Sequence, residues 1–303
     1  MRENTQEEMH YRAILSQHLP GLQIDTLSIN QMGWDSVVLD VNGEWIFRFP
    51  RRPEIEAQHE KEIALLPALS GHLHAAVPRF EVICRRSAEC KTPFVGYRKI
   101  AGNALSVQGG ASEALCRSLG EFLTELHSFP MERAASLLGI PPANVDDWKR
   151  RYEDFYDRAR ALIFPLLGEA VQAKVAAFWE SYLGEEENFQ FEPVLIHADL
   201  ASEHILIDPK SDQICGIIDW EDAAIGDPAL DFVGLLWAGG GEFVKQIQAY
   251  YQGCLGGNFV ERMHFYRDII PFHEIQFGLL TSDKIYIRGG LRNLHQIFGF
   301  MDE

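Results

Sequence analysis

The segment IHADLASEHILID, residues 196–208, places His197, Asp199 and His204 between two apolar runs. Carboxylates and imidazoles are the side chains that accept protons or bind metal ions near neutral pH. The cluster is either a polar turn that happens to contain histidine or a catalytic loop. A lone His197 would most often be a core histidine bonded to backbone, so the neighbouring motifs have to decide between these readings.

A second motif, GIID, ends an apolar run at Asp219. A carboxylate at the end of a buried strand is costly unless it holds a metal ion or a hydrogen-bond donor. Asp219 and His204 could supply an oxygen and a nitrogen to Mg²⁺, which completes its coordination with water and substrate phosphates. Asp199 would then be free to orient and deprotonate an attacking hydroxyl.

A third motif is Asp227-Pro228, followed by Asp231. Asp-Pro is typical of a helix N-terminus, so a structural role is expected for Asp227. Together the runs HADLASEH and GIIDWEDAAIGDPALDF resemble the catalytic segments shared by protein kinases and antibiotic phosphotransferases. His204 stands where protein kinases, with HRDxxxxN, carry a metal-binding Asn. Aminoglycoside 2″-phosphotransferases and macrolide phosphotransferases often carry His there.

The second run is especially similar to the GIIDF-x-DAAI-x-DP-x-x-DF of the aminoglycoside 2″-phosphotransferase group, and the resemblance covers nearly the whole chain. It implies Mg²⁺-dependent transfer of the γ-phosphate of ATP or GTP to a hydroxyl of an aminoglycoside antibiotic. It further implies Asp199 as the catalytic residue, His204 and Asp219 as metal ligands, and His197 as a brace of the catalytic loop.

The resemblance also assigns nucleotide-binding residues to the first hundred positions. Residues 33–36, GWDS, fit the family's short nucleotide loop, in which backbone near Asp35 and the Ser36 hydroxyl approach phosphate. The sequence contains no Walker motif GxxxxGK[ST]. Arg48 stands where the family has the basic residue that holds the α- and β-phosphates, and arginine can bind phosphate through two hydrogen bonds. Its expected ion-pair partner is Glu62, with Glu60 as the alternative.

The segment TPFVGYRKIAG resembles the family's hinge. Backbone groups of Arg98, Lys99 and Ile100 are expected to bind the edge of the base. Tyr97 lies near the position where family members differ in nucleotide preference, and its bulk favours GTP over ATP.

Acidic residues of the second half are the expected contacts of a cationic acceptor; the candidates are Asp222, Asp231, Asp268 and Glu274, with Trp237 as an apolar wall. Each carboxylate could instead lie on a solvated helix face. A pocket lined by carboxylates favours an aminoglycoside, whereas an apolar pocket would favour a macrolide. A metabolite hydroxyl is a further alternative. A pseudokinase-like nucleotide-binding protein is the non-enzyme alternative, and the presence of Asp199, Asp219 and Arg48 argues against it.

The composition supports a small cationic ligand. The 303 residues include 27 Lys and Arg against 44 Asp and Glu, a formal net charge of −17. This charge disfavours nucleic acid and anionic membranes as partners and attracts cations. The sequence lacks a secretory signal pattern and a run long enough to span a membrane, so a cytoplasmic protein is expected, with a monomer as the default. Five scattered cysteines predict free thiols, and the remaining histidines predict no zinc site.

Two groups of elements must position these residues. Short strand-like runs, separated by Gly33 and by the Asn42-Gly43 turn, fill residues 22–100 around a helical segment at 53–73. After the break at 101–103, apolar residues recur at helical spacing, as in the stripe along 115–126. The expected fold is α+β and protein-kinase-like. Residues 1–100 form a small N-lobe that binds nucleotide through an antiparallel sheet of five strands. Residues 101–303 form a larger, mostly helical C-lobe with the catalytic loop and the acceptor pocket.

Overall fold

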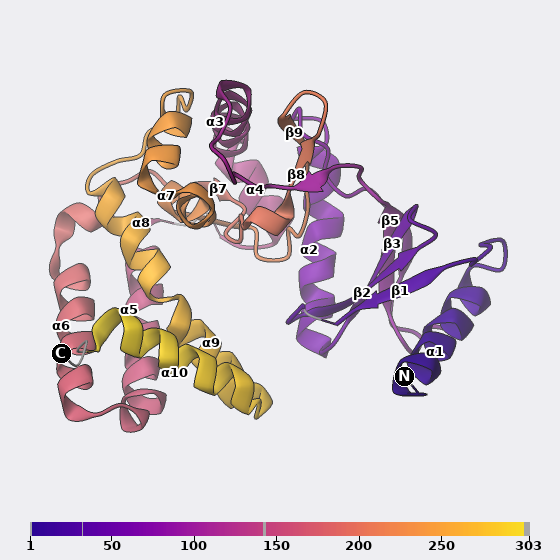
Figure 1. Ribbon diagram of the computed structural model, residues 1–303, viewed down its shortest axis with the longest axis horizontal. Coiled ribbons are helices and arrows are strands. Elements are labelled where there is room, and N and C mark those ends of the chain that lie inside the picture. Colours follow the sequence, from indigo (N-terminus) through magenta and orange to yellow (C-terminus); the bar gives the residue numbers. More distant parts are fainter. Residues whose placement is uncertain (1, 32, 142–143, 300–303) are drawn as a thin grey trace.

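Five short runs rich in β-branched and aromatic residues form the antiparallel sheet of the N-lobe, on the right of Figure 1. The computed structural model describes residues 2–31, 33–141 and 144–299. The sheet has the order β1-β2-β3-β5-β4, which confirms the predicted five-stranded N-lobe; its strands are β1 (Leu27–Asn30), β2 (Ser36–Val41), β3 (Trp45–Pro50), β4 (Phe80–Cys84) and β5 (Phe94–Arg98).

The Asn42-Gly43 turn joins β2 to β3 with φ +59° and +67°, the left-handed pair that a tight hairpin turn requires. Helix α1 (Arg2–His18) covers the sheet and places Leu15 in a small core with Leu39 and Phe47.

Helix α2 (Pro53–Leu69) follows the sheet in sequence but is anchored in both lobes. Pro53 occupies its first position, where the missing amide costs no hydrogen bond. Its last turns contribute Leu65 and Leu69 to the large core of the C-lobe. After the helix, Ala76 forms a parallel bridge with Gly216. Glu62 is therefore carried by a helix whose end is fixed to the C-lobe.

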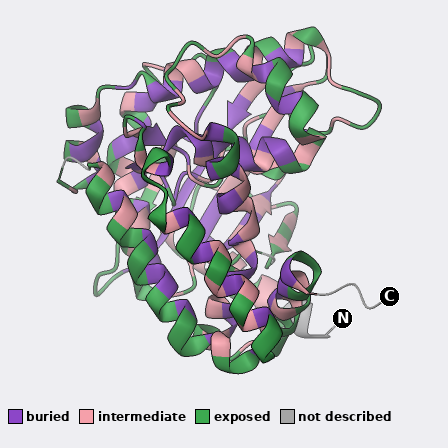
Figure 2. Cartoon of the chain, turned by 90° about the vertical axis from the view of Figure 1, so that its left-hand side faces the viewer, coloured by how far each residue is buried: buried purple, intermediate pink, exposed green. Residues whose placement is uncertain are grey.

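The C-lobe combines short strands with long amphipathic helices, whose buried and exposed faces alternate in Figure 2. The strands pair as β6-β8-β9 and β10-β7; they are β6 (Asn103–Ala104), β7 (Val194–Ile196), β8 (Ile205–Asp208), β9 (Gln213–Ile217) and β10 (Ala224–Gly226). The α-helices are α3 (Glu113–His127), α4 (Met131–Leu138), α5 (Val145–Leu162), α6 (Glu169–Gly184), α7 (Val233–Gln248), α8 (Phe259–Asp268), α9 (Ile270–Thr281) and α10 (Lys284–Phe298). The short 3₁₀ segments are η1 (Phe164–Leu166), η2 (Glu186–Phe189), η3 (Ser202–His204) and η4 (Pro228–Phe232).

The arrangement is the expected two-lobed, kinase-like α+β fold. The stripe predicted on α3 is buried along its length, and the residues of this stripe join the C-lobe core. The N-lobe sheet ends at Arg98, and β6 already pairs with β8 of the C-lobe from Asn103 onward. Among the described residues, no helix combines the length and the apolar character that a membrane crossing would need.

The cysteines differ from the prediction. Cys84, at the end of β4, and Cys90, in the loop that leads to β5, are joined by a disulfide, whereas Cys116, Cys215 and Cys254 are free. The expectation of five free thiols is wrong because the β4–β5 connection folds back and brings the first two sulfurs together.

Candidate active site

The backbone of the predicted catalytic loop is held by one buried carboxylate. Strand β7 ends directly before His197, and the amides of His197 and Ala198 donate to Asp231 at 2.9 Å and 2.8 Å. Ala198 has φ +67°, a conformation that residues with a Cβ rarely adopt. Asp231 therefore stabilises a strained backbone immediately before Asp199.

His197 braces the same loop with its side chain. Its fully buried ring places Nε2 3.0 Å from the carbonyl oxygen of Ile218 and Nδ1 3.3 Å from the amide nitrogen of Asp199. The ring also packs on Trp220, with centroids 4.6 Å apart. Burial lowers the pKa of His197, so the neutral ring donates from Nε2 and accepts at Nδ1. These contacts orient the loop, and both ring nitrogens are occupied by hydrogen bonds.

His204 and Asp219 face each other with 3.4 Å between Nε2 and Oδ2. His204 Nδ1 lies 2.8 Å from the carbonyl oxygen of Asp199, which keeps the proton on Nδ1 and directs the Nε2 lone pair at Asp219. Burial opposes protonation, but the charges of Asp219 and Asp199 raise the pKa of His204. Burial also opposes ionisation of Asp219, yet the charges of Arg48 and His204 lower its pKa. The pair thus attracts a positive charge, and one nitrogen and one carboxylate at this spacing fit a divalent cation.

Asp219 reaches this position through a sharp turn. Strand β9 stops at Ile217, two residues before Asp219, and Asp219 has φ +68°. A left-handed residue cannot continue a β-ladder, so the chain turns here and the Asp219 carboxylate stays 43 % exposed. Asp199 is similarly accessible at 51 %, with Oδ2 3.5 Å from His204 Nδ1.

Arg48 lies on β3 with its buried guanidinium among three carboxylates. Nη1 is 2.8 Å from Glu62, whereas Nη2 contacts Glu221 and lies 3.5 Å from Asp219. Burial opposes the charge, but Glu62 and Asp219 raise the pKa of Arg48, so it stays cationic. The expected Arg48–Glu62 ion pair is present. The alternative partner, Glu60, instead binds a different arginine.

Glu221 is a buried carboxylate that the motif analysis missed. It accepts a hydrogen bond from Ser36 Oγ at 3.1 Å and lies 3.3 Å from His59 Nε2, in addition to its contact with Arg48. Burial and the charge of Arg48 lower the pKa of His59 to about 3, so this ring is neutral. Although His59, Glu62 and Glu221 lie close enough to share a cation, the guanidinium of Arg48 already binds both carboxylates. The signal available in the sequence was an acidic residue two positions after Asp219, the predicted metal ligand.

The predicted nucleotide loop between β1 and β2 differs from the expectation in its side chains. Ser36 is buried and its hydroxyl is bound to Glu221, so the predicted contact of this hydroxyl with phosphate is not available in this structure. Asp35 forms an ion pair with Arg52. Trp34, at the tip, stacks on Phe277 of α9 with ring centroids 4.4 Å apart. The loop therefore contacts the C-lobe directly.

The hinge makes fewer backbone groups available than predicted. The amide of Lys99 donates to the carbonyl oxygen of Glu44 at 2.8 Å, and the side chain of Arg98 pairs with Glu44 as well. The expectation that backbone groups of Arg98, Lys99 and Ile100 bind the base is therefore corrected for the Lys99 amide. Tyr97 is buried on β5 beside these residues.

Asp222 lies within electrostatic range of Asp199 and Asp219. Partial desolvation, together with the charges of Asp199, Asp35 and Asp219, raises its pKa to about 6, and the residue is exposed to solvent. A carboxylate with a raised pKa among like charges favours the approach of a cation.

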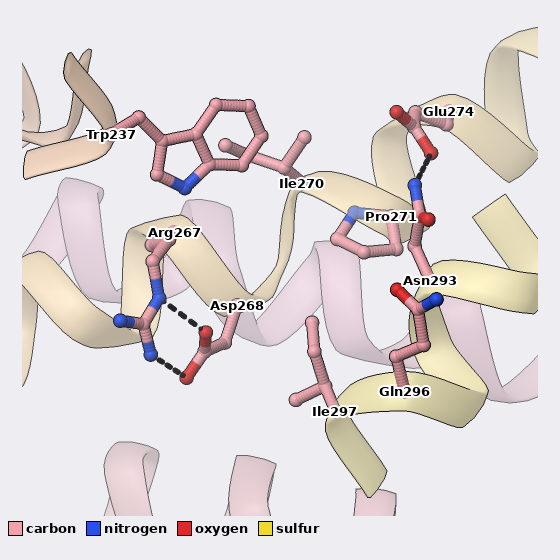
Figure 3. A pocket seen from close by; sticks show the side chains of 9 residues that line it. All are labelled: Trp237, Arg267, Asp268, Ile270, Pro271, Glu274, Asn293, Gln296 and Ile297. Carbon is pink, nitrogen blue, oxygen red and sulfur yellow. Dashed lines mark hydrogen bonds and ion pairs between the residues drawn. The ribbon is translucent and has the colours of Figure 1, made fainter. Parts of the chain in front are cut away.

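Three other predicted acceptor residues meet in one cavity of about 580 Å³, shown in Figure 3. Its lining includes Trp237 of α7, Asp268 of α8 and Glu274 of α9. Asp268 accepts hydrogen bonds from Arg267 at 2.7 and 3.0 Å, and Glu274 accepts one from Asn293 at 3.0 Å. Each carboxylate thus has one protein donor and keeps acceptor capacity toward the cavity.

The two remaining acidic candidates are fully buried. Asp231 accepts hydrogen bonds from the loop amides and lies 3.1 Å from His127 Nε2. A substrate cannot reach this buried carboxylate, so its predicted role in substrate binding is corrected. Asp227 caps η4 through the amide of Ala229 at 2.9 Å and binds Arg262 at 2.6 Å. These contacts are those of a structural residue.

Several known proteins resemble this chain in sequence and in structure. The sequence model described as the phosphotransferase enzyme family matches residues 26–265. The chain belongs to this phosphotransferase family. The GDP and kanamycin complex of APH(2″)-IIIa superimposes with a TM-score of 0.83 and 31 % identity, over 95 % of this chain and 98 % of that chain. A macrolide 2′-phosphotransferase of type I superimposes with a TM-score of 0.77 and 25 % identity, over 96 % and 97 %. Viomycin phosphotransferase of Streptomyces vinaceus is 21 % identical over 289 residues, 93 % of this chain and 96 % of its own.

The match to the phosphotransferase family includes Arg48, Asp199, His204 and Asp219 but ends before α9 and α10. The part of the chain that matches the family model thus carries the nucleotide and metal candidates. Much of the cavity lining lies in the C-terminal helices beyond it.

Proposed function

We propose that the protein transfers the γ-phosphate of ATP or GTP to a hydroxyl of an aminoglycoside, with Mg²⁺ bound at His204 and Asp219. The observation that carries the proposal is the meeting of Asp199, His204 and Asp219 on two turns, with 3.4 Å between the two metal candidates and 3.5 Å between His204 and the Asp199 carboxylate. Phosphoryl transfer depends mainly on such positioning and on charge neutralisation.

Each residue of the cleft has a distinct part in this proposal. Asp199 accepts a hydrogen bond from the acceptor hydroxyl, orients it and takes its proton. Arg48, held by Glu62, binds the α- and β-phosphates, and the backbone amides of the loop after β1 approach the same phosphates. Mg²⁺ held by His204 and Asp219 would supply positive charge that neutralises the phosphates. Since Glu62 and Glu221 already bind Arg48, phosphate must compete for its donors.

Two features support a cationic acceptor. The cleft holds Asp222 beside Asp199, and the cavity of the C-terminal helices holds Asp268 and Glu274 with Trp237 as an apolar wall. Protonated amines pair with carboxylates, and the net charge of −17 favours their approach. The similar APH(2″)-IIIa is described as a complex with GDP and kanamycin, which fits both an aminoglycoside acceptor and a guanine nucleotide. Tyr97, buried beside the predicted hinge, is in keeping with GTP as the preferred donor.

A macrolide is the second candidate acceptor, because a macrolide 2′-phosphotransferase is among the similar structures. The carboxylates of the cavity favour the aminoglycoside, since an apolar macrolide gives them few partners. We further propose a monomer in the cytoplasm that binds neither nucleic acid nor membranes, in keeping with the net charge of −17.

The test is nucleotide turnover by the purified protein with Mg²⁺, using ATP and GTP separately against aminoglycosides and macrolides. Aminoglycoside-stimulated turnover that is lost in Asp199→Asn and retained in Glu192→Gln, an exposed carboxylate of the same lobe, would support the proposal. Turnover with macrolides alone would show that the acceptor is a macrolide and would leave the proposed mechanism unchanged. Nucleotide binding without turnover for any acceptor would favour the pseudokinase-like alternative.

A further inference from the structure

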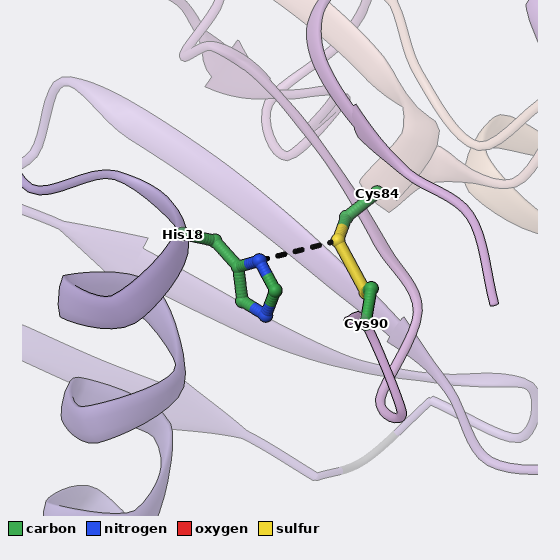
Figure 4. Close-up of side chains that lie close together, drawn as sticks. All are labelled: His18, Cys84 and Cys90. Carbon is green, nitrogen blue, oxygen red and sulfur yellow. Dashed lines mark hydrogen bonds between the residues drawn. A yellow bond between two sulfur atoms is a disulfide. The ribbon is translucent and has the colours of Figure 1, made fainter. Parts of the chain in front are cut away.

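A second cluster of reactive side chains lies in the N-lobe, shown in Figure 4. His18 ends α1, Cys84 ends β4, and Cys90 lies in the following loop; their side-chain nitrogen and sulfur atoms are all within 4.8 Å of one another. His18 Nδ1 lies 3.7 Å from the sulfur of Cys84, which is joined to Cys90. Cys84 and His18 are partly exposed, whereas Cys90 is only 4 % exposed. One sulfur is therefore accessible and has an imidazole beside it, and the other is covered.

The disulfide closes a loop that is ion-paired to α2. Arg85 and Arg86 are the first two residues inside this loop. Arg85 binds Glu60 through Nε at 2.7 Å and Nη2 at 3.0 Å, and Arg86 binds Glu56 through Nε at 3.0 Å and Nη2 at 2.6 Å. Both contacts use two nitrogens of a planar guanidinium, which fixes direction as well as distance. Constraining the loop therefore constrains one side of α2.

Helix α2 transmits this constraint to the catalytic cleft. Glu62 lies two residues after Glu60 and binds Arg48 at 2.8 Å. A groove of about 410 Å³ separates the first turns of α2 from the ends of β4 and β5, and its rim includes Cys84, Arg85 and Arg86. Side chains do not fill this groove, and the two ion pairs link the helix to the loop at its rim.

We propose that Cys84 and Cys90 are a reversible redox pair, and that their disulfide holds the 84–90 loop in the conformation that keeps α2, and with it Arg48, in place for nucleotide binding. The consequence for nucleotide binding rests on the proposed function. The redox chemistry of the pair does not.

The exchange uses an external low-molecular-weight or protein disulfide as the oxidant. His18 accepts the proton of the Cys84 thiol, and the resulting thiolate attacks the external disulfide, forming a mixed disulfide and releasing one external thiolate. The Cys90 thiol, after losing its proton to solvent, then attacks the Cys84 sulfur and releases the second external thiolate. Two electrons pass from the protein to the oxidant, and an external dithiol reverses both steps by attacking accessible Cys84.

The first experiment counts thiols in the denatured full-length protein after equilibration with dithiol and disulfide buffers. The expected count changes from three to five on reduction, since Cys116, Cys215 and Cys254 are free in both states. Cys84→Ser and Cys90→Ser should remove the change, whereas Cys254→Ser, an exposed and unpaired control, should keep it with one thiol fewer in both states. His18→Ala should slow re-oxidation near neutral pH without changing the final count.

The second experiment measures nucleotide affinity in both redox states. The KM for the nucleotide, or the Kd of GTP by calorimetry if no acceptor turns over, should rise roughly two- to fivefold on reduction, the range that exposed ion pairs account for. Cys84→Ser should match the reduced wild type under all conditions. The double variant R85Q/R86Q should keep the thiol response and lose the affinity response.

Several outcomes would overturn the inference. Five thiols in the absence of reductant, or one zinc ion per chain in the reduced protein that is lost in Cys84→Ser, would assign the cluster another chemistry. An unchanged nucleotide affinity with a normal thiol response would remove the link to α2. Because the thiol count needs no substrate, failure of the proposed acceptor chemistry stays distinguishable from failure of the redox pair.

Discussion

Asp231 holds the backbone amide of Ala198 at 2.8 Å, and Ala198 is the left-handed residue between His197 and Asp199. A fully buried carboxylate is costly unless its oxygens are bonded. Asp231 meets this requirement by accepting from two consecutive loop amides, and His127 contacts it from the other side. A residue of the DPALDF segment thus maintains a strained conformation beside the proposed catalytic base.

We expect Asp231→Asn to lower kcat by roughly ten- to a hundredfold, with little change in either KM. An amide has one oxygen, so its NH₂ would face one of the two loop amides and leave it unsatisfied. The same loss should reduce the free energy of unfolding by about 1–3 kcal/mol. Steady-state kinetics and urea unfolding measure both, with Asp157→Asn on the exposed face of α5 as the control. A normal kcat in a destabilised variant would show that the loop geometry does not depend on Asp231.

Asp227→Asn should affect stability far more than chemistry at the cleft. Asp227 binds Arg262 at 2.6 Å, and both side chains are fully buried. Removing one charge leaves the other unpaired in the core, which costs about 3–5 kcal/mol. The expected result is a marked fall in the urea midpoint measured by circular dichroism. A loss below about 1 kcal/mol would mean that Arg262 finds another partner or solvent.

Much of the fold was predictable from local patterns in the sequence. The five strands follow from short β-branched runs with turn residues between them, and α3 follows from its stripe of apolar residues. Arg48 and Glu62 could be paired by resemblance because both lie on regular elements. These predictions needed only the spacing of apolar residues within each helix or strand and the order of the elements along the chain.

The errors share a different cause, namely contacts between distant segments. Asp231 was predicted to bind substrate because sequence alone does not reveal that it lies under residues 197–198. Ser36 was predicted to contact phosphate because the sequence does not reveal its hydrogen bond to Glu221, which joins the two lobes. The Cys84–Cys90 disulfide depends on how the β4–β5 connection folds back, and no spacing rule specifies this. Burial and partners across lobes decide these roles, and neither is a local property.

Glu221→Gln should lower the KM for nucleotide roughly three- to tenfold. The carboxylate contacts Arg48, so its negative charge competes with phosphate for the same guanidinium. Glutamine keeps an oxygen for Ser36 but removes the charge. Glu62→Gln is the matched control and should raise the KM, because it removes the carboxylate that positions Arg48 at 2.8 Å. A rise in KM in both variants would mean that Glu221 also serves to position Arg48.

His204 should determine the concentration of Mg²⁺ that the activity requires. Its Nε2 faces Asp219 at 3.4 Å, so His204→Ala removes one of two proposed ligands. We expect the Mg²⁺ concentration for half-maximal activity to rise roughly ten- to a hundredfold, the usual cost of perturbing a metal site. His204→Asn should recover part of the loss, since protein kinases carry Asn at this position. Titration of turnover with Mg²⁺ at saturating nucleotide measures the effect, and an unchanged requirement in His204→Ala would exclude His204 as a ligand.

Acceptor affinity should fall as the pH drops through about 6. The pKa of Asp222 is raised to about 6, above its ordinary value of 3.8, so the side chain is ionised above this pH and neutral below it. A cationic acceptor binds the ionised form, and its KM should rise up to roughly tenfold per pH unit below 6. Asp222→Asn should have a weaker affinity at pH 8 and a flatter profile. The pKa of His204 is raised as well, so only the difference between wild type and Asp222→Asn isolates the contribution of Asp222.

The same pKa makes an independent prediction for folding. Because the folded protein holds the Asp222 proton more tightly than the unfolded chain does, the stability associated with this proton is fully present below about pH 4. It is lost as the pH rises through 6. Asp222→Asn should therefore be more stable than wild type at pH 8 and equally stable near pH 4, as measured by urea unfolding. Equal stabilities at both pH values would mean that the neighbouring carboxylates do not raise the pKa of Asp222, and the pH dependence of acceptor binding would then need another titrating group.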